Sequence, residues 1–225
     1  KSAALEAIEK ANIEYFFELE EFAGTAREAA DSAILQVAAE IVLPEGMSQG
    51  MGAYEISVES EGSVQDTLVT YSISRWSFTG GAHGMYNIEY HTYSITDGYE
   101  LSLADLFTAP QLLGMEKLLR EKLYTQYGTD NDEGLAEQGF FPEYIALTEN
   151  FQITPEGITF YYNPYAIGCY AHGAAEVLTS GRNAVPAQPG SRPYIPGTAP
   201  RDNKKRPESH DSDLFLLSGN HPLQK

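Results

Sequence analysis

Residues 66–79 read DTLVTYSISRWSFT, and residues 85–96 read MYNIEYHTYSIT. Both stretches are rich in tyrosine, threonine and isoleucine, which favour extended backbone on a half-buried surface. In the first stretch, polar side chains alternate with Val69, Tyr71 and Ile73, and this period of two places successive side chains on opposite faces of a sheet. The two stretches therefore predict neighbouring strands, and they decide the fold class.

A third extended stretch, 53–60 (AYEISVES), comes before these two. Asp97-Gly98 follows them and is typical of a turn that needs a residue tolerant of positive φ. A parallel sheet requires a long crossover, usually a helix, between consecutive strands, and none separates these three stretches. We therefore predict an antiparallel meander.

Helical patterns flank the predicted meander on both sides. Before it, residues 3–22 and 26–42 carry apolar side chains at helical spacing and predict two helices. After it, residues 102–107 and 110–127 predict two more, and the polar, glycine-punctuated stretch 128–139 predicts a loop.

Two short strands, 151–154 and 158–163, follow and are joined by a turn that ends in Gly157. The order helices, strands, helices, strands predicts an α+β fold, with N-terminal helices and an antiparallel meander sheet packed by helices. The composition changes at residue 179, because seven of the 12 prolines lie beyond it. We predict an N-terminal helical segment (1–52), an α+β domain (53–178) and a Pro-rich, weakly basic tail (179–225).

The chain is strongly acidic. Its 225 residues include 14 Lys and Arg against 32 Asp and Glu, a formal charge of −18. Residues 1–178 hold seven of the basic and 28 of the acidic residues, a net charge of −21. This balance argues against nucleic acid and anionic lipid as partners, and leaves a basic protein, a cationic polymer or simple solubility as explanations.

Membrane insertion and disulfide bonding are not expected. No apolar run approaches the length of a transmembrane helix. For an exported protein, we expect the signal segment to be missing from this sequence, because Lys1 leads directly into a helical pattern. The single cysteine, Cys169, excludes an intrachain disulfide framework and a Cys-based zinc finger.

The densest local motif is Thr79-Gly80-Gly81-Ala82-His83-Gly84, directly after a predicted strand. Its glycines indicate positive φ or a close approach of the backbone. One interpretation is a nest of N–H groups that binds an anion, with His83 as ligand or base. The simpler interpretation is a glycine-rich bend in which His83 bonds a neighbouring carbonyl. The candidate binding residues here are Gly80, Gly81, His83 and Gly84.

A second cluster, Tyr170-Ala171-His172-Gly173, contributes Tyr170 and His172 as candidates, and Tyr165 lies just before it. Of the 15 tyrosines, 14 precede residue 179. Exposed tyrosines form platforms for sugar rings or protein partners, whereas tyrosines within strands fill the faces of a sheet. We favour the second interpretation for most of them.

No catalytic residue, metal site or cofactor is predicted. His83, His91 and His172 allow a site of two histidines and one carboxylate to be drawn, but they lack the ligand spacing of known metal motifs. The sequence has no Gly-x-Ser-x-Gly motif, and Cys169 lies too close to His172 along the chain to predict a catalytic dyad.

Several separate motifs together resemble one family. The first group is WSFTGGAHG at 76–84, Thr96-Asp97-Gly98 and LSLADLF at 101–107, and the second is the pattern F.ITPEGI.F.Y.PY.IG.YA.G..EV over 151–177. They resemble an uncharacterised extracytoplasmic domain, the C-terminal domain of RsiV/PdaC-type proteins. Asn12-Ile13 resembles a trace of the companion N-terminal domain, which would make segment 1–52 a remnant of it.

The resemblance implies an α+β cell-envelope domain without enzyme chemistry of its own. Members of the family include a sensor that binds lysozyme and a protein in which this domain accompanies a deacetylase. We therefore expect a non-catalytic, extracytoplasmic binding or sensor module, secreted or lipid-anchored, with a basic, lysozyme-like protein as partner. One alternative is an accessory module that binds peptidoglycan fragments or carbohydrate through tyrosines and the 80–84 loop. Another, less favoured, is a metal-dependent hydrolase using His83 and His172.

Overall fold

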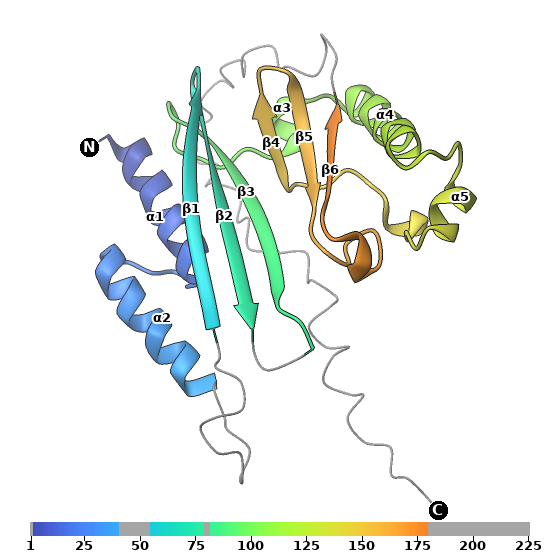
Figure 1. Ribbon diagram of the computed structural model, residues 1–225. Helices are drawn as coiled ribbons and strands as arrows, with labels where there is room; N and C mark the ends of the chain where they lie inside the picture. The colour runs from blue at the N-terminus through green and yellow to red at the C-terminus, as the bar shows by residue number, and fades with distance from the viewer. Residues whose placement is uncertain (1, 41–54, 79–81, 180–225) are drawn as a thin grey trace, which may run out of the picture. The chain divides into compact units, whose positions relative to one another are not determined.

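The computed structural model describes residues 2–40, 55–78 and 82–179 (Figure 1). Residues 41–54, 79–81 and 180–225 lie outside the described residues, and with them most of the predicted tail. The described helices and strands are α1 (Ala3–Phe17), α2 (Ala26–Glu40), β1 (Glu55–Gln65), β2 (Leu68–Phe78), β3 (Met85–Ser94), α3 (Leu103–Leu106), α4 (Ala109–Tyr127), α5 (Asp132–Glu137), η1 (Pro142–Tyr144), β4 (Phe151–Thr154), β5 (Gly157–Tyr162), η2 (Tyr170–His172) and β6 (Ala175–Thr179).

The predicted α+β fold is confirmed. Strands β1, β2 and β3 form one antiparallel sheet in chain order, the first sheet, and the residues opposite one another run without interruption from Glu55↔Phe78 to Gln65↔Leu68. β1 is longer than the predicted strand 53–60, because its pairing with β2 continues to the turn at Asp66.

Strands β4, β5 and β6 form a second antiparallel sheet, the second sheet, and helix α4 packs beside it (Figure 1). β4 and β6 alternate buried side chains with more exposed ones, whereas β5 is buried at every residue except Thr159. The buried side chains include Phe151 and Ile153 of β4. They meet Leu119 and Leu123 of α4 in the main apolar core of the chain. Burial of apolar area is thus the main source of stability on this side of the molecule.

Helix α1 lies against the first sheet, where Ile8 packs on Val69 and Tyr93. The prediction of a single helix over 3–22 was wrong about where the helix ends, because α1 ends at Phe17. The chain takes a left-handed conformation at Glu18 (φ 54°), and the N–H of Glu18 bonds the carbonyls of Glu14 and Tyr15. This closes the helix five residues early, before the apolar pattern itself ends.

The predicted loop 128–139 was wrong in part, because it contains α5. Asn131 caps this short helix by accepting a hydrogen bond from the N–H of Gly134 at 2.8 Å. Leu135 is fully buried in the main core and holds the helix against it. Six residues are too few to show a helical period in the sequence, so the cap was the available signal.

Candidate functional site

Three of the predicted site residues form an aromatic cluster at the start of β3. The His83 ring stacks on the Tyr170 ring with centroids 3.9 Å apart and an interplanar angle of 16°. Tyr165, whose φ is 70°, places its ring 5.5 Å from the Tyr170 ring. Tyr170 Oη donates to the Gly84 carbonyl at 2.8 Å, which fixes the cluster to the strand.

The glycines of this cluster permit close approach. A Cβ on Gly84 would lie 2.9 Å from the Trp76 indole, and a Cβ on Gly173 would lie 2.9 Å from Tyr86 Oη. His83 Nδ1 lies 3.0 Å from the Gly84 carbonyl oxygen, so this nitrogen carries the hydrogen. That contact is the one expected from the simpler interpretation of the motif. Gly80 and Gly81 lie outside the described residues.

His172 contacts a different part of the chain from His83. Its Nε2 bonds the Gln138 carbonyl, and its ring lies 4.3 Å from the ring of Phe140 and 6.2 Å from that of Tyr127. These contacts tie η2 to the segment that follows α5. Within residues 2–40, 55–78 and 82–179, no three His, Cys, Asp or Glu side chains are grouped so as to hold a metal ion.

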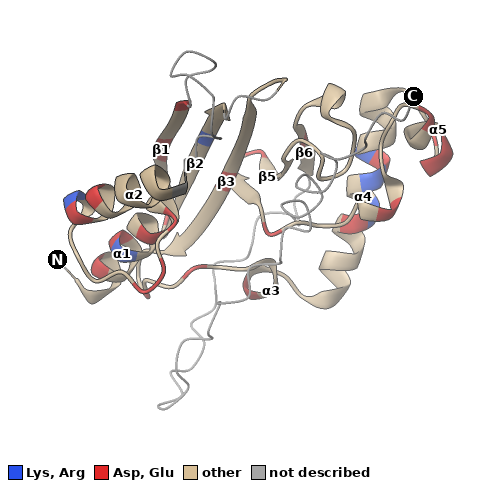
Figure 2. Ribbon diagram, turned by 90° about the horizontal axis from the view of Figure 1, so that it is seen from below, with Lys and Arg blue, Asp and Glu red and all other residues tan. Residues whose placement is uncertain are grey.

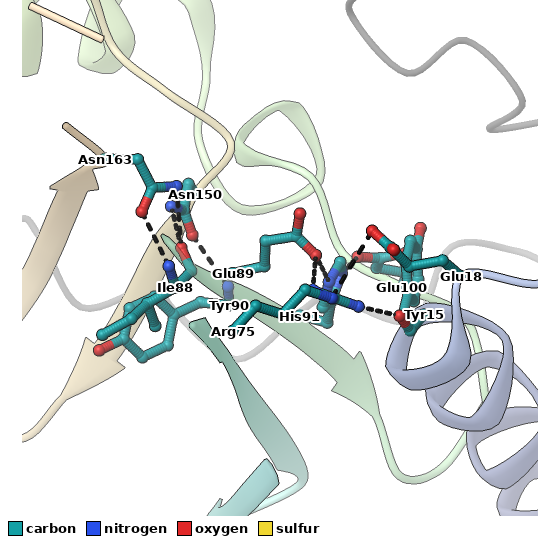
Figure 3. A network of polar contacts seen from close by, with 10 residues as sticks. All are labelled: Tyr15, Glu18, Arg75, Ile88, Glu89, Tyr90, His91, Glu100, Asn150 and Asn163. Carbon is teal, nitrogen blue, oxygen red and sulfur yellow. Dashed lines mark hydrogen bonds and ion pairs between the residues drawn. The ribbon is translucent and has the colours of Figure 1, made fainter. Parts of the chain in front are cut away.

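A network of charged side chains under α1 was missed by the sequence reasoning (Figure 3). Arg75 Nη1 bonds Glu89 Oε2 at 2.9 Å, and the other Arg75 Nη bonds the carbonyl of Tyr15. His91 Nδ1 bonds Glu100 Oε1 at 2.7 Å, while its Nε2 lies 3.7 Å from Glu89, an ion-pair distance.

Helix α1 completes this network. The Tyr15 ring stacks on the His91 ring at 3.7 Å, and Tyr15 Oη donates to Glu100 at 2.9 Å. Arg75 Nε lies 3.6 Å from Glu18 at the end of the helix. The available sequence signal was an arginine, a glutamate and a histidine at strand positions that share a face with Val69 and Ile73.

Burial and charge act in opposite directions on this network. Burial lowers the pKa of His91, but its contacts with Glu100 and Glu89 outweigh burial and leave the pKa raised. Burial raises the pKa of Glu89, but its contacts with His91 and Arg75 outweigh it and leave the pKa lowered. The network therefore favours its charged form, which suits a structural clamp between α1 and the sheet.

Two asparagines join the two sheets along β3 (Figure 3). Asn163 Oδ1 accepts from the N–H of Ile88 at 2.8 Å, and Asn150 Oδ1 accepts from the N–H of Tyr90 at 2.8 Å. Both asparagines also donate through Nδ2 to the Ile88 carbonyl. Their side chains thus take the place that a neighbouring strand would have beside β3.

The face of the first sheet opposite α1, here called the open face, is polar and exposed along β1, whereas further across it Leu68 and Thr92 are buried. The register places on it the side chains of Glu55, Ser57, Glu59, Glu61 and Ser63 from β1, all of them exposed. Its aromatic residue with the greatest exposure is Trp76, at 38%. Glu61, Gly62, Ser63, Thr70, Ser72 and Gln152 line a depression at its border with β4.

Positive charge is absent from the open face in the described part of the sheet. Arg75 is the one Lys or Arg in β1–β3, and it points to the side of α1. Figure 2 shows the other blue segments on α1, α2 and α4. The open face can therefore attract a cationic partner, and the exposed Ser57 and Ser63 of β1 offer hydrogen bonds.

Comparison with known proteins agrees with this fold. Residues 104–178 match the family model described as "Protein of unknown function (DUF3298)". No curated protein sequence matches the chain. None of the described helices is both long enough and apolar enough to span a membrane.

Two crystal structures of DUF3298 proteins are similar to the chain. One, from Bacteroides fragilis, has a TM-score of 0.66 at 24% identity and covers 79% of this chain and 75% of its own. The other, from Pseudomonas aeruginosa, has a TM-score of 0.52 at 21% identity, with coverage of 70% and 72%. At these identities the likeness concerns the fold. The chain thus carries, at residues 104–178, a DUF3298 domain of the RsiV/PdaC C-terminal type.

Proposed function

We propose that this chain is a non-catalytic, extracytoplasmic binding module, and that the open face of its first sheet binds a basic protein of the lysozyme type. The observation that carries the proposal is the row of Glu55, Glu59 and Glu61 on a face without Lys or Arg in the described strands. The extracytoplasmic location rests on the resemblance to the RsiV/PdaC-type family.

The chemistry of the open face fits a protein partner. Carboxylates attract a cationic protein over about 10 Å at 0.1 M salt, which raises the association rate. Partly exposed tryptophans are frequent anchors of protein interfaces. Trp76 lies on the same face as the glutamates, opposite Ser57 in the register.

A titration with egg-white lysozyme tests this function. We expect the triple variant Glu55→Gln, Glu59→Gln, Glu61→Gln to weaken binding about tenfold, because it removes three facing charges. The control is Glu133→Gln, Glu137→Gln, Glu143→Gln, which changes the net charge equally on exposed residues of α5 and η1. We expect the control to bind within about twofold of the parent.

Two outcomes count against the proposal. Equal losses in both triple variants would mean that only net charge matters and that the open face has no special part. Absence of binding to the parent chain at about 100 μM, a weak affinity for a specific complex, would exclude this partner.

The aromatic cluster favours a second candidate function, the binding of peptidoglycan fragments. Half-exposed rings such as Tyr170 stack on sugars, and Trp76 lies beside Gly84 of the cluster. Trp76 is the single tryptophan of the chain, so its fluorescence reports this region alone. Titration with muropeptides should change that fluorescence and the NMR signals of His83, and no change in either would exclude the function.

A further inference from the structure

The two edges of the first sheet differ in what covers them. On β3, the N–H groups of Ile88 and Tyr90 bond Asn163 and Asn150. Further along β3, the Thr92 carbonyl accepts a hydrogen bond from the N–H of Leu101 at 2.7 Å. The N–H of Ser94 donates to the carbonyl of Tyr99 at 3.0 Å. The outward backbone groups of β3 are therefore bonded along most of its length.

The same contacts fix which backbone groups of β1 point outward. In antiparallel strands, alternate residues direct N–H and C=O to one neighbour and then to the other. The backbone N–H and C=O groups of even-numbered β3 residues point away from β2. Those of odd-numbered β3 residues therefore point toward β2, as at Glu89, which lies opposite Ile73. On β2, the backbone groups of even-numbered residues then point toward β1, as at Ser72, which lies opposite Glu61. The register has no bulge, so the outward groups of β1 belong to Ile56, Val58, Ser60, Gly62 and Val64.

No described residue forms a hydrogen bond with these outward groups. β1 has 11 residues and contains no proline, lysine or arginine. A long edge strand without such protection is a template for another strand. Ile56 and Val64 add to this tendency, because they are 49% and 69% exposed on the face that carries α1.

The side chains of β1 favour one kind of added strand. Glu55, Glu59 and Glu61 lie on one face of β1. The other face includes the apolar side chains of Ile56, Val58 and Val64. A second copy of β1 would bring glutamates near glutamates, which is unfavourable. A strand that alternates basic with apolar residues would meet carboxylates on one side and Ile56, Val58 and Val64 on the other.

We infer that β1 binds its partner by strand addition, and that the partner contributes an extended segment alternating Lys or Arg with apolar residues. This rests on the proposed function, since it specifies how the acidic surface takes a basic partner. Backbone hydrogen bonds along the edge supply the affinity, and the alternating side chains supply the selectivity.

Amide hydrogen exchange of the whole chain tests the inference directly. The probe is a peptide of about eight residues in which lysine alternates with valine, long enough to span most of β1. We expect exchange of the Val58, Ser60 and Gly62 amides to slow at least about tenfold when the peptide is bound. A peptide of equal composition with lysines and valines in separate blocks serves as control and should give no protection.

The variant Ser60→Pro separates strand addition from binding to the open face. It removes an outward N–H without removing a hydrogen bond to β2, and proline is tolerated on edge strands. We expect it to abolish the protection and to weaken peptide binding about tenfold, with its circular dichroism unchanged. Unchanged peptide binding by Ser60→Pro would overturn strand addition, whatever the outcome with lysozyme.

Exchange in the free chain gives an independent check. If the Val58 and Ser60 amides are already strongly protected without peptide, the edge has a partner within the chain and the inference is wrong. Lysozyme binding that depends on the three glutamates but leaves these amides unprotected would overturn the inference and leave the proposed function standing.

Discussion

The two sheets of this molecule are stabilised by different interactions. The second sheet packs against α4 and α5 in a large apolar core that includes the fully buried Phe160 and Leu119. On its helix-facing side, the first sheet has a small apolar cluster of Ile8, Val69 and Tyr93, and beside it the charged network under α1. The sheet with less apolar packing is the one that presents an acidic strand, β1, whose outer edge forms no hydrogen bond with the described residues.

This difference has a general reason. A strand buried on both faces has few side chains left for a partner, so its sequence is determined by packing. A sheet held by one helix and by polar clamps keeps a solvent-facing side whose residues are free to serve binding. The following predictions test the contrast, from the largest expected effect to the smallest.

The largest effect is expected in the second sheet. Phe160→Ala should lower the free energy of unfolding by about 3–5 kcal/mol, because it leaves a cavity in a close-packed core. Ile8→Ala in the first sheet's cluster should cost about 2 kcal/mol, near the lower limit for such changes, because few neighbours surround it. Urea unfolding measures both, and equal losses would contradict the contrast.

The charged network should come next. Arg75→Met removes the cation that bonds Glu89 and the end of α1. We expect this variant to lower the free energy of unfolding by about 2–3 kcal/mol. The Arg75 side chain is 12% exposed, whereas Lys117, in an ion pair on α4, is 81% exposed. Lys117→Met is the control and should cost less than about 0.5 kcal/mol. Similar losses in the two variants would show that Arg75 makes no more than a surface contact.

The junction of the two sheets should show a moderate effect. Asn163→Ala leaves the N–H of Ile88 without its acceptor and should cost about 1–2 kcal/mol. Asn163→Asp keeps a carboxylate oxygen as acceptor and should cost less. Exchange of the Ile88 amide should accelerate in the alanine variant and change little in the aspartate variant. The reverse order would mean that the asparagine acts mainly as a donor to the Ile88 carbonyl.

The smallest effect is the pH dependence of α1 docking. The folded-state pKa of His91 is raised above its ordinary value of 6.5, by Glu100 and Glu89 against the opposing effect of burial. Its contribution to stability is therefore fully present below that value and lost as pH rises through the folded pKa. The groups that face His91 are Glu89, Glu100 and the Tyr15 ring, with Arg75 bonded to the same Glu89.

Unfolding free energies at about pH 6 and pH 8.5 measure this contribution. The parent chain should lose more stability over this range than His91→Gln, which has no imidazole to titrate. Glu89, whose pKa is lowered, contributes above 4.5 and loses its contribution only at acid pH, so it does not interfere. An equal pH dependence in both proteins would show that His91 is not held in its charged form.

Much of the fold was predictable because its signals are local. Alternation at Val69, Tyr71 and Ile73 predicted the strand, and the absence of long crossovers predicted antiparallel order. The end of α1 at Glu18 was not predictable, because the apolar pattern continues past the residue where the chain turns. α5 was not predicted, because a helix of six residues is too short to show a helical period of apolar side chains.

The candidate site was predictable only in part. The glycines and rings that brought His83 and Tyr170 to attention do meet in the structure, although 86 positions separate Tyr170 from its acceptor Gly84. The same pattern grouped His172 with them, whereas its ring packs on Phe140. No local spacing distinguishes a histidine that faces one neighbour from a histidine that faces another.

The sequence by itself determined the α+β class, the meander, the acidity and the resemblance to a family, since each depends on composition or on residues near one another in the chain. The tertiary structure decided which edge of the first sheet is bonded by other described segments and which is not. Asn163 reaches Ile88 across 75 positions, and Tyr15 reaches Glu100 across 85. Such contacts depend on how distant segments pack, and a local pattern carries no information about the segment it will meet.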